Sequence, residues 1–224
     1  MVNLSAGWRF TILDFPVRVH FSFFLIALLL GLRISNIFYL ASWVLIVFVS
    51  VLLHELGHAV VSRYYGRAPY IELYSMGGKT FSTRYSILSY PKEILISFSG
   101  PLAGFILGGL LFAVYRWLGP FGSNFLNFVV GQLLWVNIGW GILNLIPILP
   151  LDGGTIMRNL YHWLKNPYDE RTPLKISIGF GILAAAASLL LLGSGGLYLA
   201  LLVGWLTLNN YMALRQGYPS DNII

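Results

Sequence analysis

Charged residues are scarce in this sequence. Asp, Glu, Lys and Arg make up 10% of its 224 residues, whereas hydrophobic residues make up 57%. Soluble domains carry about 25% charged residues, so this chain has too little charge to cover a water-exposed surface of ordinary size. The composition therefore favours a chain folded in lipid, and the length predicts a single domain over residues 1–224.

Cysteine is absent, which excludes disulfides, thiolate zinc ligands and cysteine nucleophiles. A cleavable signal peptide is not expected either, because the first 20 residues contain Arg9, Asp14, Pro16 and Arg18 in place of an apolar core. The formal net charge is +6. The basic residues lie between apolar runs, without the aromatic and basic interleaving of a nucleic-acid surface, so no nucleic-acid partner is expected.

Long apolar runs are what the sequence has in abundance. A membrane-spanning helix needs about 20 mainly apolar residues. Six runs reach or approach that length: 17–35, 37–65, 94–118, 125–146, 174–192 and 197–214. We therefore expect an all-α polytopic membrane protein with about six transmembrane helices in the lipid bilayer, of which 37–65, 94–118 and 125–146 form the core.

The basic residues predict how these helices are oriented. If the N-terminus is cytosolic, Arg33 and Arg116 fall outside the cell. The other twelve fall on the cytosolic side or at its edge: Arg9, Arg18, Arg63, Arg67, Lys79, Arg84, Lys92, Arg158, Lys165, Arg171, Lys175 and Arg215. Because cytosolic loops carry an excess of Lys and Arg, this distribution predicts a multi-pass cell-membrane protein with cytosolic N- and C-termini.

Two segments do not read as membrane helices. Residues 68–82 contain β-branched and aromatic residues around Gly77-Gly78, which predicts a β-hairpin between the second and third helices. At membrane depth such a hairpin has to be buried in protein or line a wet cavity. Residues 144–154 contain Pro147 and Pro150, which end the fourth helix, followed by two glycines that permit a sharp turn.

Smaller features have structural interpretations. Gly100, Gly104 and Gly108 recur every four residues on the third helix, which predicts a thin face for close helix packing. Residues 161–172 form a polar stretch before the fifth helix, and His162 is interpreted as a solvated loop residue.

The second helix contains the sequence His54-Glu55-Leu56-Gly57-His58, an HExxH pattern. Residues four apart share a helix face, so both imidazoles can bind one metal ion. Glu55 lies beside that face and can act as general base on a metal-bound water. Zinc suits this site because it accepts imidazole and carboxylate ligands and lowers the pKa of bound water to about 7.

The surroundings of the motif strengthen this interpretation. The motif follows the apolar run 48–53, which places it within the predicted membrane helix. Inserting a charged side chain near the bilayer centre costs about 2.5 kcal/mol or more, so ionisable residues at this depth indicate a function. The structural alternative is that the two histidines form hydrogen bonds to other helices.

A third ligand is needed, because catalytic zinc sites use three protein ligands and one open position. Asp152 is the acidic residue embedded in apolar sequence, just after the fourth helix and before Gly153-Gly154. The alternative is that Asp152 caps a helix that begins near Gly153.

HELGH within a spanning helix, followed by NLIPILPLDGG, resembles the site-2 protease family of intramembrane zinc metalloproteases, in its minimal prokaryotic form without PDZ or CBS modules. The resemblance implies that His54, His58 and Asp152 bind one Zn²⁺ and that Glu55 is catalytic. It implies that Asn144 lines the active site and stabilises the oxyanion.

The resemblance also implies that the hairpin over 70–81 is a membrane re-entrant element that pairs with an unwound substrate, and that Ser99-Gly100-Pro101 serves packing. Family members often carry Asn near Gly104 and Arg where Thr155 stands, and His near His20; the roles of these positions stay open.

The expected function is cleavage of transmembrane protein substrates within or near their membrane segments. A metal or proton transporter, or an inactive membrane scaffold, are the alternatives. A transporter typically contains internal repeats and polar residues in several spans, which this sequence lacks. The substrate, the oligomeric state and the resting conformation do not follow from the sequence.

Overall fold

The computed structural model of the protein describes residues 7–83 and 86–216. The chain divides into two compact units, one formed by residues 1–88 and 99–143 and the other by residues 89–98 and 144–224. Arg84 and both chain ends, which contribute to the predicted orientation, lie outside the described residues.

The first unit begins with a β-hairpin that the sequence analysis missed. Strand β1 (Gly7–Ile12) pairs antiparallel with β2 (Phe15–His20). The two-residue loop between them, Leu13 and Asp14, has positive φ at both positions, as type I′ turns require. The prediction of helix from residue 17 onward is therefore wrong over Val17–His20, which are strand.

The predicted hairpin at 68–82 forms and joins this first one. Strands β3 (Pro69–Tyr74) and β4 (Gly77–Ser82) pair antiparallel, and β3 pairs in parallel with β2, so the sheet order is β1-β2-β3-β4. The hairpin loop is Ser75-Met76, whereas Gly77 and Gly78 belong to strand β4. The glycine pair thus lies in a strand instead of forming the turn.

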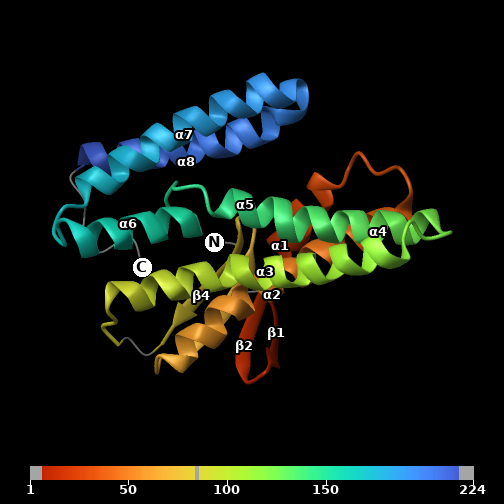
Figure 1. Ribbon diagram of the computed structural model, residues 1–224, viewed down its shortest axis with the longest axis horizontal. Helices are drawn as coiled ribbons and strands as arrows, with labels where there is room; N and C mark the ends of the chain where they lie inside the picture. Colours follow the sequence, from red (N-terminus) through yellow and green to blue (C-terminus); the bar gives the residue numbers. More distant parts are fainter. Residues whose placement is uncertain (1–6, 84–85, 217–224) are drawn as a thin grey trace. The chain divides into compact units, whose positions relative to one another are not determined.

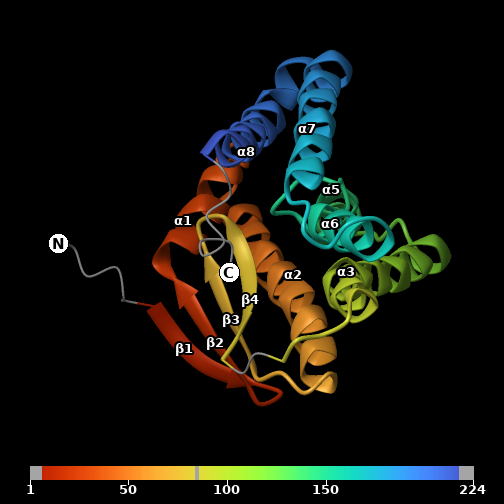
Figure 2. The ribbon, with the colours of Figure 1, turned by 90° about the vertical axis from the view of Figure 1, so that its left-hand side faces the viewer.

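Alternation along the strands gives the sheet one apolar face. Val17, Val19, Ile71 and Leu73 are each at most 2% exposed and pack against helix α2. Figure 2 shows the four strands side by side, with α2 running along them. Because successive side chains alternate, the residues between these four lie on the opposite face, which is polar.

Six helical segments belong wholly or mainly to the first unit among the residues that the structure describes; the first two lie between β2 and β3 in the chain, and the other four follow β4. Helix α2 begins at the N-cap Asn36, whose side-chain oxygen accepts from the backbone N–H groups of Phe38 and Tyr39. The segments are α1 (Phe21–Leu30), α2 (Ile37–Tyr64), α3 (Tyr90–Leu118), α4 (Asn124–Leu134), the π-helix η1 (Trp135–Gly139) and α5 (Trp140–Asn144). Residues 90–98 of α3 and Asn144 of α5 belong to the second unit.

The second unit contains helix α6 (Asp152–Leu164), helix α7 (Arg171–Leu192), the 3₁₀ turn η2 (Gly193–Gly196) and helix α8 (Leu197–Gln216). Helices α7 and α8 run side by side (Figures 1 and 2). Helix α6 takes in the first part of the predicted polar stretch. His162 is 7% exposed in α6, so its interpretation as a solvated loop residue is wrong.

Within the part of the chain that the structure describes, five helical segments are long and apolar enough to cross a membrane: Ile37–Tyr64, Tyr90–Leu118, Asn124–Asn144, Arg171–Leu191 and Leu197–Gln216. Within the most apolar 18 residues of each segment, 17–33% of residues are buried inside the protein, and the other residues keep part of their surface exposed. Such a surface is suited to lipid. Helix α1, predicted as a sixth span, has ten residues and is about 15 Å long, half the thickness of the hydrocarbon core.

Glycines allow helices α2 and α3 to approach closely, as the four-residue spacing predicts. A Cβ added at Gly57 of α2 would collide with the backbone oxygen of Ser99. A Cβ at Gly104 would lie 3.1 Å from the backbone oxygen of Asn137 in η1, and one at Gly108 would lie 2.5 Å from the side chain of Ile138. The thin face of α3 therefore packs against two neighbouring segments.

Candidate metal centre

Helix α2 places His54 and His58 on one face, one turn apart. Their Nε2 atoms lie 3.1 Å apart and their rings meet edge to face, with centroids at 4.8 Å. His58 is 8% exposed. Two imidazoles whose Nε2 atoms point to the same place are arranged as two ligands of one ion would be.

Gly100 of α3 lies directly against this pair. A Cβ at Gly100 would collide with Nε2 of His58 and would lie 2.8 Å from Nε2 of His54. The absence of a side chain at this position therefore makes room for the two ligand nitrogens beside α3. The family resemblance implied packing for Gly100; its position also bears on access to the histidines.

Glu55 is held by strand β4. The carboxylate is buried, with the residue 4% exposed, and the Thr80 hydroxyl lies 2.8 Å from its Oε2 and 3.0 Å from its backbone oxygen. A Cβ at Gly78 would lie 2.6 Å from Oε1 of the same carboxylate. Sequence reasoning missed both residues, although their period-two spacing in the strand places them on one face.

A second polar contact lies one helical turn before His54. Nδ2 of Asn137 donates to Ser50 Oγ at 2.9 Å and to the backbone oxygen of Leu133 at 2.9 Å. Asn137 belongs to the π-helix, an irregularity that often marks functional sites. The backbone oxygen of Asn137 also leaves little room beside Gly104, which explains why a larger residue is absent there.

Asp152 is the first residue of α6. Leu151 occupies the N-cap position, so the interpretation of Asp152 as the helix cap is wrong. The two glycines that follow let the preceding loop fold onto the first turn. A Cβ at Gly153 would lie 2.6 Å from the backbone oxygen of Ile146, and one at Gly154 would lie 2.5 Å from that of Ile148.

Two buried polar residues hold the loop before Asp152 within the second unit. The backbone N–H of Leu149 donates to Ser177 Oγ of α7 at 2.9 Å. Nδ2 of Asn210 in α8 donates to the backbone oxygen of Leu149 at 2.8 Å and to Ser177 Oγ at 2.9 Å. The backbone N–H and the backbone oxygen of Leu149 are therefore both hydrogen-bonded to side chains of α7 and α8.

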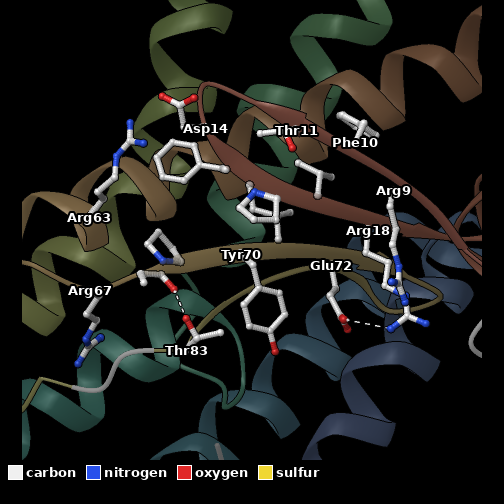
Figure 3. A pocket seen from close by; sticks show the side chains of 16 residues that line it. Arg9, Phe10, Thr11, Asp14, Arg18, Arg63, Arg67, Tyr70, Glu72 and Thr83 are labelled. Atoms are coloured by element: carbon white, nitrogen blue, oxygen red, sulfur yellow. Dashed lines mark hydrogen bonds and ion pairs between the residues drawn. The ribbon is translucent and has the colours of Figure 1, made fainter.

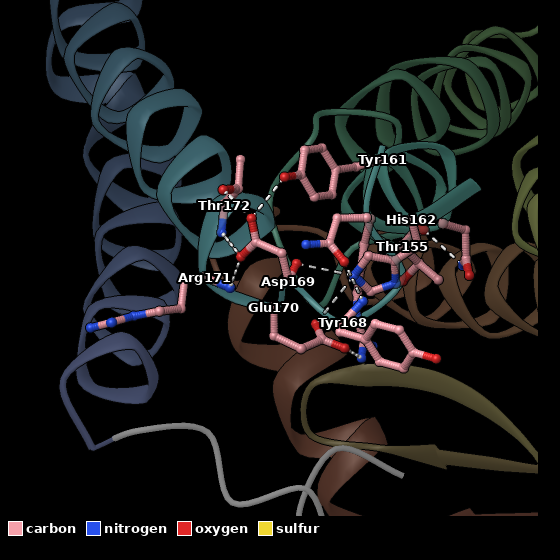
Figure 4. Close-up of polar contacts among 11 residues, drawn as sticks. Thr155, Tyr161, His162, Tyr168, Asp169, Glu170, Arg171 and Thr172 are labelled. Atoms are coloured by element: carbon pink, nitrogen blue, oxygen red, sulfur yellow. Dashed lines mark hydrogen bonds and ion pairs between the residues drawn. The ribbon is translucent and has the colours of Figure 1, made fainter. Parts of the chain in front are cut away.

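The far end of α6 is joined to α7 by a cluster of polar contacts (Figure 4). The Asp169 carboxylate accepts from the hydroxyls of Tyr161 and Thr172, at 2.7 and 2.6 Å. Nε of Arg158 donates to Glu170 at 2.8 Å, and Nε2 of His162 lies 3.2 Å from the Asp169 backbone oxygen. The bonds from Thr172 and Tyr161 hold the pKa of Asp169 well below its usual range.

The remaining sequence-predicted positions lie as follows. Asn144 is the last residue of α5 and is partly buried. His20 ends β2, with its Nε2 3.7 Å from the Glu72 carboxylate. Thr155 donates its hydroxyl to the backbone oxygen of Leu151 at 3.3 Å, a local bond within α6.

Among the described residues, His54, His58 and Asp152 form a group that could hold a metal ion. Two imidazoles and one carboxylate are the donor set of a catalytic zinc site that keeps a position open for water. The room that Gly100 leaves for both imidazole nitrogens is consistent with that set. Zinc is therefore the ion that these residues fit.

Known proteins resemble this chain over most of its length. The model of peptidase family M50 matches residues 122–186. A zinc metalloprotease of Methanocaldococcus jannaschii is 35% identical over 179 residues, which make up 77% of this chain and 49% of that protein. This chain thus spans about half the length of that curated relative.

A solved structure is also similar. The site-2 protease from Methanocaldococcus jannaschii superposes with a TM-score of 0.59 and 30% sequence identity, over 94% of each chain. Together with the five apolar helices, this likeness identifies a membrane protein. The chain belongs to the site-2 proteases of peptidase family M50.

Proposed function

We propose that this protein is an intramembrane zinc metalloprotease that hydrolyses a peptide bond within or near the transmembrane segments of membrane protein substrates. The observation that carries the proposal is the pair His54 and His58, whose side chains meet on a candidate spanning helix. Glu55 lies between them in the sequence, and its side chain is buried. Ionisable residues at membrane depth are costly and therefore point to function.

In this proposal His54, His58 and Asp152 hold the zinc ion. When bound, zinc would lower the pKa of a water ligand and polarise the carbonyl to be attacked. Glu55 takes a proton from the water molecule that attacks the peptide carbonyl, and it gives that proton to the amine nitrogen that leaves when the C–N bond breaks. The hydroxyl of Thr80 beside the carboxylate keeps Glu55 in one orientation. Asn144 donates a hydrogen bond to the developing oxyanion.

The sheet supplies a way to bind an unwound substrate. Strand β4 is an edge strand, and its residues Gly78 and Thr80 lie against Glu55. A substrate segment that adds as a further strand along β4 would pair its backbone beside the catalytic carboxylate. In this proposal the hairpin β3–β4 is a membrane re-entrant element, and the helical substrate unwinds before it is cut.

We further propose a topology of six membrane segments in one transmembrane metalloprotease domain, with α1 and its flanking turn as the first segment. The exposed side chains Phe21, Leu25 and Leu29 of α1 support its contact with lipid. The predicted distribution of basic residues supports cytosolic termini. The zinc site would then be reached by water from the cytosolic side.

The test is cleavage by the purified protein in proteoliposomes, with a panel of single-span substrates and mass spectrometry of the products. Glu55→Gln keeps the shape of the side chain and removes the base, so we expect cleavage to fall at least a hundredfold while bound zinc is unchanged. Glu93→Gln, which alters a carboxylate at the start of α3, is the matched control and should retain activity.

Full cleavage by Glu55→Gln with normal zinc content would refute the proteolytic mechanism. Zinc or proton flux through the same proteoliposomes, undiminished in Glu55→Gln, would favour a transporter. Asp152→Asn tests the third ligand separately, since undiminished zinc binding in that variant would remove Asp152 from the site.

A further inference from the structure

A groove of about 790 Å³ lies on the polar face of the sheet in the first unit, away from Glu55. Its lining comes from β1, β2 and β3, the end of α2 and the residues that follow it. The charged residues that line it are Arg9, Arg18, Arg63, Arg67, Asp14 and Glu72. Four guanidinium groups thus face two carboxylates, and the proposed protease mechanism uses none of these six.

The two ends of the groove differ (Figure 3). Arg63, Arg67 and Asp14 lie at one end, near the tip of the first hairpin, where Arg63 donates to the backbone oxygen of Leu13 at 3.1 Å. The guanidinium of Arg63 also stacks on the Phe15 ring, 3.9 Å from its centroid. This end is occupied by contacts that hold the hairpin to α2.

The other end carries a pair of like charges. Arg9 and Arg18 are directly opposite each other in the β1–β2 register, an arrangement that is unfavourable without an anion nearby. Glu72 is opposite Arg18 on the next strand, 3.7 Å from its guanidinium, and it also faces His20 at 3.7 Å. One carboxylate therefore lies within 4 Å of both a guanidinium and an imidazole.

This end of the groove leads into the short apolar helix α1. Strand β2 ends at His20, and α1 begins at the next residue. Phe21, Leu25 and Leu29 recur every four residues on α1 and are 74%, 47% and 49% exposed. Three residues beyond Arg18, the chain thus changes from a cationic strand to a helix with an exposed apolar stripe.

We propose that the groove binds the phosphate headgroup of an anionic phospholipid at Arg9 and Arg18, with the acyl chains along the apolar stripe of α1. The phosphate would relieve the repulsion between the two arginines, because guanidinium groups bind phosphate oxygens through paired hydrogen bonds. Basic residues beside a membrane segment attract anionic lipid in the same way. This site is independent of the proposed proteolytic activity.

The test uses the full-length protein in neutral detergent. Native mass spectrometry and thermal unfolding are recorded with added phosphatidylglycerol, phosphatidylcholine, inorganic phosphate or an acidic peptide. We expect phosphatidylglycerol to be retained and to raise the Tm, and the other three to have little effect. Arg9→Gln should weaken phosphatidylglycerol binding at least fivefold, and Arg9→Lys, which keeps the charge but loses the paired hydrogen bonds, should weaken it less than Arg9→Gln does.

Arg9→Gln has a second signature that loss of folding cannot imitate. Because it removes one of two facing like charges, the lipid-free variant should unfold at the same temperature as the wild type or higher. Arg33→Gln, an exposed arginine outside the groove, is the control and should bind lipid normally.

Four results would overturn the proposal. One is unchanged phosphatidylglycerol binding by Arg9→Gln, and another is an equal loss in Arg33→Gln. Equal stabilisation by inorganic phosphate would indicate a site for free anions, and equal stabilisation by an acidic peptide would indicate a protein partner. Either would replace the lipid as the ligand.

Discussion

At the residue scale, the candidate site depends on glycines as much as on the residues that carry its chemistry. Gly100 leaves room for the Nε2 atoms of His54 and His58, and Gly78 leaves room for the Glu55 carboxylate. Both glycines lie in regular elements, where glycine is conformationally costly. Their positions are explained by the close approach of catalytic groups.

Gly100→Ala should therefore impair zinc binding. Its Cβ would occupy the space of the two histidine nitrogens, so we expect zinc affinity to fall about tenfold to a hundredfold, the range for lost support of metal ligands. Since alanine favours helix over glycine, the change should not unfold α3. Zinc content and competition titration are the measurements.

Gly109→Ala, on the same helix, is the matched control because nothing lies within 4 Å of the added Cβ. It should bind zinc like the wild type. Equal zinc affinity in both variants would show that Gly100 serves helix packing alone.

The candidate metal-site residues stand out in the sequence, but the residues that contact them do not. His54, Glu55 and His58 stand together in sequence, and Asp152 stands out in apolar surroundings. Thr80 reaches Glu55 from 25 residues away, and Asn137 reaches Ser50 from 87 residues away. Such contacts depend on how elements pack, which no local pattern encodes.

At the element scale, the long helices were predictable and the first hairpin was not. Apolar runs of spanning length have few alternative structures. Leu13-Asp14 lacks the Asn-Gly or Asp-Gly signature of a type I′ turn, so the turn between β1 and β2 carried no signal. The parallel pairing of β2 with β3 joins residues more than 50 positions apart, again without a local pattern.

The loop before Asp152 should depend on Asn210. Asn210→Leu removes the bonds from the candidate membrane helix α8 to the Leu149 backbone oxygen in the loop and to Ser177 of α7. Hydrogen bonds between membrane helices contribute about 0.6 kcal/mol each on average, so we expect a loss of about 1–2 kcal/mol in the free energy of unfolding. Denaturation in mixed micelles measures it.

Asn209→Leu, one residue earlier on α8, is the control and should leave stability nearly unchanged. If both variants unfold at the same denaturant concentration as the wild type, the Ser177 and Asn210 contacts do not support the loop.

The link between α6 and α7 should weaken in acid. Bonds from Thr172 and Tyr161 lower the pKa of Asp169 in the folded protein. A carboxylate with a depressed folded pKa contributes stability above its unfolded pKa, near 4, and that contribution is lost as the pH falls toward the folded pKa. We therefore expect faster hydrogen exchange at the start of α7 at pH 3 than at pH 6, after correction for intrinsic rates.

Asp169→Asn keeps an oxygen for the backbone N–H groups of Arg171 and Thr172 but cannot titrate. Its exchange at the start of α7 should depend less on pH than that of the wild type. Zinc-free protein is used for both, so that protonation of metal ligands does not contribute. The same pH dependence in the variant would exclude Asp169 as the cause.

At the scale of the whole molecule, the absence of cysteine makes the predicted orientation directly testable. Single cysteines can be introduced at exposed basic positions without removing native thiols: Lys165→Cys on the predicted cytosolic side, and Arg33→Cys and Arg116→Cys on the other. A membrane-impermeant maleimide added to intact cells should label the latter two. Lys165→Cys should react after the membrane is opened, because cytosolic loops hold most of the basic residues. Labelling of Lys165→Cys in intact cells, with Arg33→Cys and Arg116→Cys protected, would reverse the topology and place the entrance to the zinc site on the outer face.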